Sequence, residues 1–203
     1  MQVIFFAKDN KDDKIIFMNK VFKFLLVFLS IVVALFLGTL YYHDFFSSPQ
    51  VVEKEMGPYV VVTKRFVGAY HKVGPTMDEV DGWLRENGVE STKGVGLYLD
   101  DPAEVEESEL RSDVGSIVED VDEEVLARIK EKFEVREIPK AKSAVIEFSI
   151  KSNLSYIIAP MKAYPALTQH WIEKGYAEAE GDIGIEIYDI PGKVTSYMFA
   201  IPE

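Results

Sequence analysis

A long stretch without any charged residue stands near the start of the chain and is the strongest pattern in the sequence. From Phe24 to Tyr42 the residues are dominated by Leu, Val, Phe and Ile. At 1.5 Å per residue, a helix of this length nearly matches the hydrocarbon core of a bilayer, which is about 30 Å thick. Aromatic residues follow the stretch, as they do at membrane interfaces. The pattern predicts one transmembrane helix over residues 24–42.

The charges that flank this stretch predict its orientation. Five lysines precede it, and neither Lys nor Arg occurs between Tyr41 and Gln50. By the positive-inside rule, residues 1–23 form a cytoplasmic segment, and everything after Ser47 lies on the non-cytoplasmic side, which is the periplasm if the protein is bacterial. Met18 is an alternative start site. A cleaved signal peptide is the competing interpretation, although the run is long for a signal core and no small-residue cleavage pair follows it.

Beyond the apolar stretch the pattern alternates between periods of two and of about 3.6 residues, which is typical of mixed strands and helices. A polar, proline-containing linker is expected over residues 43–57 and one domain over residues 58–203. Strands are expected at residues 59–70, 94–99, 111–118, 143–150, 184–189 and 194–201, with a short strand or extended connector at 135–139. Helices are expected between Gly74 and Gly88, at residues 123–133 and between Asn153 and Lys174.

The second part of this pattern repeats the first. Trp83 precedes a helix-ending Gly88 as Trp171 precedes Gly175, and GLYLDDP from Gly96 aligns with IEIYDIP from Ile185. The chain therefore predicts an α+β fold made of two β-α-β-β units. Such units side by side place their helices on one side of the strands and leave a central crevice between the halves, where small ligands bind.

Composition narrows the range of functions. The formal net charge is −12, so the average surface repels phosphate backbones and nucleic acid is not an expected partner. The acidic excess is concentrated between Asp100 and Glu134, as a solvated face or as a docking surface for a basic partner. The chain has no cysteine, and its three histidines show no ligand spacing, so neither a metal site nor a cofactor is expected.

One segment resembles a known family. The run from Gly94 to Val118, GVGLYLDDPAEVEESELRSDVGSIV, is similar to the part of GyrI-like and AraC-type effector-binding domains in which a strand ends in a Tyr/Asp/Asp-Pro turn. The C-terminal GIEIYDIP resembles that family's Phe-Glu-x-Tyr strand. The resemblance covers about Pro58 to Pro202. It implies a small-molecule-binding module with its pocket between the halves, where an acidic residue at the position of Glu186 faces lipophilic cations.

The candidate site residues follow from the strand pattern together with this resemblance. Glu186 alternates with Ile185 and Ile187, so Glu186 and Tyr188 face away from the apolar side of their strand. In a crevice, desolvation raises the pKa of such a carboxyl group. Other candidates for an aromatic cage around a cation are Tyr70, Tyr98, Tyr156, Tyr164 and Trp171. Tyr98 occupies the position matching Glu186 when shifted by one residue, and helical spacing makes Trp171 a core candidate as well.

Three functions remain open. The first is a membrane-tethered module that captures amphipathic or cationic compounds. The second is a hydrolase of strained electrophilic molecules, with Glu186 as base and Tyr98 as acid; the family resemblance suggests this chemistry, but a binder is expected before an enzyme. The third is a membrane-anchored protein-interaction module. The sequence does not determine the oligomeric state.

Overall fold

The computed structural model describes residues 11–176 and 184–202. The chain divides into two compact units, residues 1–46 and 47–203. The first unit contains helix α1 (Lys11–Tyr42), which begins earlier than the apolar stretch alone predicts. Within it, Met18–Tyr42 has a mean hydropathy of 2.7 and no buried residues, and it is the one helix of the described chain long and apolar enough to cross a membrane. A membrane anchor and a signal sequence share these properties.

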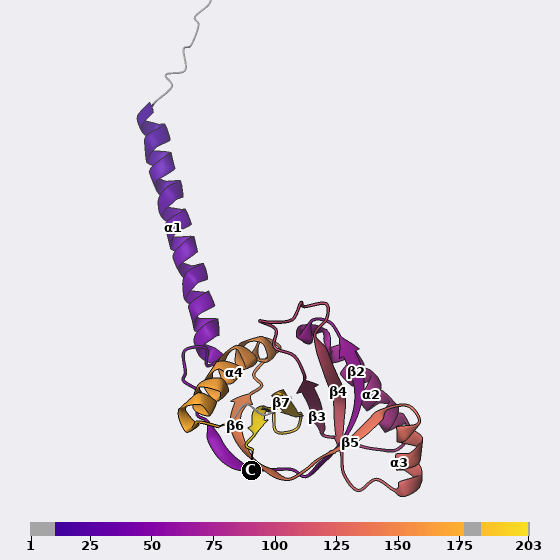
Figure 1. Cartoon of the computed structure of the whole chain (residues 1–203). Coiled ribbons are helices and arrows are strands. Elements are labelled where there is room, and N and C mark those ends of the chain that lie inside the picture. Colours follow the sequence, from indigo (N-terminus) through magenta and orange to yellow (C-terminus); the bar gives the residue numbers. More distant parts are fainter. Residues whose placement is uncertain (1–10, 177–183, 203) are drawn as a thin grey trace, which may run out of the picture. The chain divides into compact units, whose positions relative to one another are not determined.

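The second unit is built on one curled antiparallel sheet (Figure 1). Eight strands occur in the described residues, in the spatial order β1-β6-β8-β7-β3-β4-β2-β5. They are β1 (Val52–Met56), β2 (Tyr59–Val67), β3 (Lys93–Tyr98), β4 (Arg111–Val118), β5 (Glu134–Ile138), β6 (Ala141–Ser149), β7 (Gly184–Asp189) and β8 (Val194–Ala200). The helices are α2 (Gly74–Glu86), α3 (Glu123–Lys130) and α4 (Ser155–Lys174), with a short 3-10 turn at Tyr70–Lys72. The predicted α+β fold with two β-α-β-β units is confirmed, as β2-α2-β3-β4 and β6-α4-β7-β8.

Two outer strands extend the predicted units. Val52–Met56 falls in the expected linker but forms β1, so the linker prediction is wrong there. β1 pairs with β6 of the second half, while β5 pairs with β2 of the first half, so each half receives its outer strand from the other. The sequence VEKEM is short and charged, as edge strands often are, and this is why it resembles a linker.

The outer strand β1 is also fastened to α4. The Glu53 carboxylate accepts hydrogen bonds from Tyr176 Oη at 2.9 Å and from His170 Nε2 at 3.0 Å, and it pairs with Lys142 Nζ at 2.6 Å. These contacts, led by the one from Lys142, lower the pKa of Glu53 to about 2. The carboxylate therefore joins β1 to β6 and to the C-terminal end of α4.

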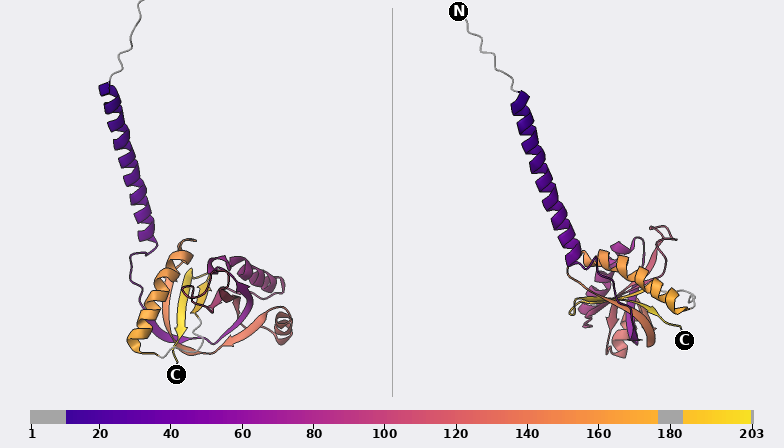
Figure 2. Two further views of the ribbon diagram at one scale, coloured as in Figure 1. Left: turned by 45° about the horizontal axis from the view of Figure 1, so that its top comes forward. Right: turned by 90° about the vertical axis from the view of Figure 1, so that its left-hand side faces the viewer.

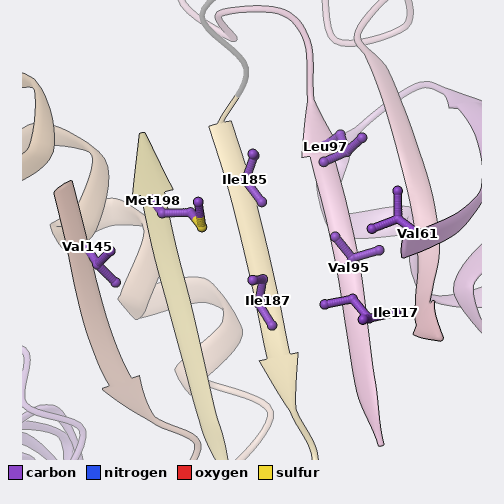
Figure 3. Packing of buried hydrophobic residues seen from close by; sticks show 8 residues of the cluster. All are labelled: Val61, Val95, Leu97, Ile117, Val145, Ile185, Ile187 and Met198. Carbon is purple, nitrogen blue, oxygen red and sulfur yellow. The ribbon is translucent and has the colours of Figure 1, made fainter. Parts of the chain in front are cut away.

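The two faces of the sheet pack differently. The inner face of the curl holds an apolar cluster drawn from both halves, which Figure 3 shows on one side of the strands: Val61, Val95, Leu97, Ile117, Val145, Ile185, Ile187 and Met198. On the outer face, α2 covers β2 and β4 through Val80 and Leu84, and α4 covers β6 and β8 through Ala163 and Leu167. Figure 2 shows strands between the two helices (left view). The central strands β3 and β7 therefore lie between the helices rather than under them.

Candidate ligand-binding site

A cleft of about 1910 Å³ lies over the central strands. Its floor includes residues of β3 and β7, one wall is α2 and the other is α4, so all its sides belong to the second unit. The volume exceeds the roughly 300–1,000 Å³ of a typical small-molecule pocket. The cleft is thus a broad groove between the halves, where the repeat predicts a crevice.

The floor is nearly two-fold symmetric about one pair of residues. In the antiparallel pairing of β3 with β7, Gly96 lies opposite Glu186, Gly94 opposite Tyr188, and Tyr98 opposite Gly184. Side chains on alternate residues share a face, so these six positions face the cleft together. Tyr98 is therefore the counterpart of Tyr188, and Gly96 that of Glu186. The match of Tyr98 to Glu186 expected from the sequence is therefore wrong by two residues, because the ungapped alignment of the two strands is itself displaced by one.

Glycines on the floor let aromatic rings lie against the sheet. A Cβ atom on Gly96 would come within 2.8 Å of the Tyr98 ring, and one on Gly184 within 3.0 Å of the Tyr164 ring. Cβ atoms almost never come as close as 2.8 Å to another atom, and at 3.0 Å the ring would have to shift by a few tenths of an ångström. The bare backbone at these positions leaves room for the Tyr98 and Tyr164 rings against the sheet.

Glu186 is the centre of a buried hydrogen-bond chain. Its side chain is buried, and each carboxylate oxygen accepts one tyrosine hydroxyl: Oε1 from Tyr164 at 2.8 Å and Oε2 from Tyr188 at 2.7 Å. The Tyr98 hydroxyl lies 2.8 Å from that of Tyr188. Because Tyr188 donates its proton to Glu186, Tyr98 donates to Tyr188. Tyr98 and Glu186 are linked through Tyr188 and not directly.

Burial controls the ionisation of this group. Desolvation raises the pKa of Glu186 to about 7, although the hydrogen bonds from Tyr188 and Tyr164 oppose the shift. The surrounding groups are acids too: burial and the nearby carboxylate raise the pKa values of Tyr98, Tyr164, Tyr188 and, on β8, Tyr197. These phenols stay protonated near neutral pH, so they supply hydroxyl donors and no positive charge. Near pH 7, Glu186 is therefore about half ionised, and no basic side chain of the described residues is hydrogen-bonded to it.

The other predicted site residues take different positions. Tyr70 packs edge-on against Tyr98 with ring centroids 4.7 Å apart, and its hydroxyl binds the backbone of Asp100 and of Arg111. Tyr156 is 41% exposed and lies 6.0 Å from the Tyr188 ring. All three predicted residues Tyr70, Tyr156 and Trp171 line the cleft.

Trp171 belongs mainly to the packed interior, the alternative that its helical spacing indicated. It is buried and makes edge contacts with Tyr176 and Phe199 at 5.0 and 5.9 Å. Tyr164, expected only as one wall of an aromatic cage, instead donates directly to Glu186. Its position on α4, over Gly184 of the facing strand, shows in the fold and not in the local sequence.

Ion pairs beside the cleft hold the strands together. Arg111 and Asp113 share a strand face, a pattern that predicts a pair, but Arg111 Nη2 binds Asp100 Oδ1 at 2.7 Å. Asp113 is fully buried and binds Arg65 of the neighbouring strand β2 and, at 2.6 Å, Arg136 of β5, one strand farther along the sheet. Arg65 lies directly opposite Asp113 in the pairing of β2 with β4, closer than Arg111 two residues away on the same strand. The Asp100 carboxylate is therefore paired with Arg111.

Comparison with known proteins places this fold. A family model described as "GyrI-like small molecule binding domain" matches residues 49–197. The second unit, with its two halves and the cleft between them, is thus a domain of the small-molecule-binding class. The chain belongs to the GyrI-like family.

Individual relatives agree with the family and add detail. A protein named DNA gyrase inhibitor from Pectobacterium carotovorum subsp. carotovorum is 42% identical over 55 residues, which are 27% of the chain and 36% of that relative. The crystal structure of the EcmrR C-terminal domain matches 76% of the chain and 98% of that domain with a TM-score of 0.55 at 20% identity. The structure of SAV2435 bound to tetraphenylphosphonium matches 75% of the chain and 94% of SAV2435, with a TM-score of 0.50 at 10% identity. At these identities the two structures establish the fold alone.

Proposed function

We propose that this protein is a single-pass membrane protein whose GyrI-like domain captures lipophilic cations in the cleft between α2 and α4. The observation that carries the proposal is Glu186, a carboxylate buried on the cleft floor that is contacted by hydroxyl groups and by no basic side chain among the described residues. An unpaired buried charge is costly, and a cation that enters the cleft removes that cost.

The surroundings of Glu186 suit a cation that also carries apolar groups. Tyr70, Tyr98, Tyr156 and Tyr188 bring aromatic rings to the floor and rim, and ring faces attract cations. SAV2435, which shares the fold, is described as bound to tetraphenylphosphonium, a cation surrounded by apolar rings. Ligands of this class are therefore the first to test.

The test is calorimetric titration of tetraphenylphosphonium into the full-length protein in nanodiscs, with empty nanodiscs subtracted. We expect micromolar affinity, and Glu186→Gln should weaken it by roughly 1.5–3 kcal/mol, or about ten- to a hundredfold, because a charged contact is lost. Glu131→Gln is the matched control, since Glu131 is exposed at the end of α3. Triphenylphosphine oxide, which has similar apolar rings and no net charge, should bind more weakly than the cation.

The protonation of Glu186 supplies a second signature. Burial raises the pKa of Glu186 to about 7. As the pH is increased towards 7, the affinity for the cation should therefore increase about tenfold per pH unit, and above pH 7 it should level off. The Glu186→Gln protein should show a flat profile. Equal affinities of the parent and Glu186→Gln proteins at pH 8 would reject the carboxylate as the counter-charge.

For the first unit, we propose that residues 24–42 anchor the chain with residues 1–23 in the cytoplasm and the domain on the opposite side. The lysines before the stretch support this orientation. Because the natural chain has no cysteine, Lys8→Cys and Glu131→Cys each carry a single thiol. In intact cells a membrane-impermeant maleimide should label the thiol at position 131 and not the one at position 8; the reverse result rejects the orientation.

A further inference from the structure

The outward face of α4 is apolar along most of its length. Ile157, Met161 and Ile172 are 56%, 63% and 73% exposed, and Pro165 and Thr168 fall between them on the same face. These five residues form the α4 stripe, and all of them border the cleft. At 1.5 Å per residue the α4 stripe is about 22 Å long.

A ligand at Glu186 leaves most of the α4 stripe uncovered. Tyr164, the α4 residue that binds Glu186, lies near the middle of the helix, so the ends of the stripe are each about 10 Å away along the axis. A cation the size of tetraphenylphosphonium spans about that distance in total. Exposed apolar surface of this extent at the rim of a binding site marks contact with another apolar phase or partner.

The opposite wall shows that this surface is specific to α4. In α2, the exposed positions after the first turn are Asp78, Glu79, Arg85 and Glu86, all charged. α4 contains one acidic residue, Glu173, and two lysines, Lys162 and Lys174, whereas the chain as a whole has a net charge of −12. Acidic surface repels anionic lipid headgroups, whereas an apolar helix with a single acidic residue does not. The charge pattern therefore favours a lipid surface as the occupant of the stripe.

The length of the connecting chain brings the domain to such a surface. α1 ends at Tyr42 and β1 begins at Val52, so a fully extended connection spans at most about 35 Å. If α1 is anchored in a bilayer, the domain cannot move farther than this from the lipid headgroups. Weak contacts of an interfacial helix become effective under such confinement.

We infer that the α4 stripe docks on the surface of the membrane in which α1 is anchored, so that the cleft opens at the lipid interface and receives its ligands from there. This inference rests on the proposed membrane anchor. It identifies α4 as the entry side of the cleft and α2, with its charged exposed residues, as the side that stays in water.

A single thiol reports directly on this contact. Met161→Cys and, on α2, Glu86→Cys each carry an environment-sensitive fluorophore in the full-length protein, reconstituted in phosphatidylcholine vesicles with one-fifth phosphatidylglycerol. Bromine on the lipid acyl chains quenches fluorophores that touch the hydrocarbon region. We expect several-fold stronger quenching at position 161 than at position 86, and the same label at position 161 should lose this quenching when Ile157 and Ile172 are both replaced by Glu.

Each outcome decides the question. Equal quenching at the two positions, in a chain that resists alkaline carbonate extraction, overturns the docking and leaves the anchor and the cation site intact. A chain that carbonate removes from the vesicles overturns the anchor and the docking together. A blue shift at position 161 in detergent that grows with protein concentration assigns the α4 stripe to a second copy of the chain and also overturns the docking. In every case, calorimetric titration with tetraphenylphosphonium measures separately whether the cation site binds.

Discussion

The two halves of the domain share one architecture and differ where they meet the cleft. β2-α2-β3-β4 and β6-α4-β7-β8 occupy equivalent places in the sheet, and Tyr98 is equivalent to Tyr188. At the centre, however, the first half supplies Gly96 and the second half supplies Glu186. The walls differ as well, since the exposed positions of α2 are charged and those of α4 are largely apolar.

This contrast separates what the scaffold requires from what the site requires. Both halves need buried strand and helix faces, and both have them. One carboxylate is enough on the axis between the halves, because a second at Gly96 would lie directly opposite the first and repel it. If the proposed function is correct, this asymmetry serves ligand binding, and substitutions at equivalent positions test it.

The largest effect is expected on the charge at the centre. Burial raises the pKa of Glu186 from 4.5 to about 7, so the folded protein prefers the protonated form. The protonated Glu186 side chain contributes fully to stability below pH 4.5. This contribution is lost as the pH rises through 7, which lowers the free energy of unfolding by about 3 kcal/mol. Glu186→Gln should remove this loss, so at pH 8 its free energy of unfolding should exceed that of the parent by up to that amount.

Denaturant titrations from pH 4.5 to pH 8 measure this difference. Glu53, with a pKa lowered to about 2, acts only below pH 4.5 and does not interfere. If the free energy of unfolding changed with pH in the same way in the parent and in Glu186→Gln, a raised pKa of Glu186 would be contradicted.

The next effect concerns the equivalent tyrosines. Tyr188→Phe removes a donor to Glu186 and leaves the Tyr98 hydroxyl without its acceptor, so it should destabilise the fold at pH 8 by about 2 kcal/mol and raise the pKa of Glu186 further. Tyr98→Phe removes only the terminal hydroxyl and should cost about 1 kcal/mol or less. Thermal unfolding at pH 8 compares the two. An equal loss of stability in the two variants would mean that Tyr98 and Tyr188 stabilise the Glu186 carboxylate to the same extent.

A smaller effect is expected on the bare positions of the floor. Gly96→Ala places a methyl group 2.8 Å from the Tyr98 ring and should displace it, at a cost of about 1 kcal/mol in stability and a measurable loss of cation affinity. Gly94→Ala is the control, because its nearest neighbour is the flexible end of Met77 at 3.0 Å. Calorimetry should find the affinity of the control within about twofold of the parent. A larger loss in Gly94→Ala than in Gly96→Ala would refute the role given to the Tyr98 ring.

The smallest effect is expected on the charged wall. Asp78 lines the cleft from α2 and is exposed, so Asp78→Asn should reduce cation affinity by only a few tenths of a kcal/mol. The reduction should vanish at high salt, where exposed charges are screened. A loss as large as that of Glu186→Gln would move the charge recognition from the floor to the α2 wall.

Much of the fold could be predicted from the sequence because it follows local periodicity. Alternation around Ile185 and Ile187 correctly placed Glu186 on the face opposite the apolar cluster, and the repeated Trp and Gly positions revealed the two units. Gly88 and Gly175, with φ of 78° and 69°, follow helices α2 and α4 as their positions predicted.

What the sequence missed depends on pairing between distant segments. The equivalence of Tyr98 with Tyr188 is set by the register of β3 against β7, which an alignment anchored on the following prolines misplaced by one residue. The partners of Asp113 come from two other strands, β2 and β5, and the donor Tyr164 reaches Glu186 from a helix. None of these contacts leaves a local pattern.

The crossing of β1 and β5 between the halves has a consequence for the origin of the fold. A single β-β-α-β-β repeat, produced by itself, would lack a partner for its first strand and could find one only in a second molecule. The arrangement within this chain is the one that a strand-exchanged homodimer would have if its two subunits were joined end to end. Gene fusion of such a dimer would release the two central positions from symmetry, leaving one free to become Glu186 while the other remained Gly96.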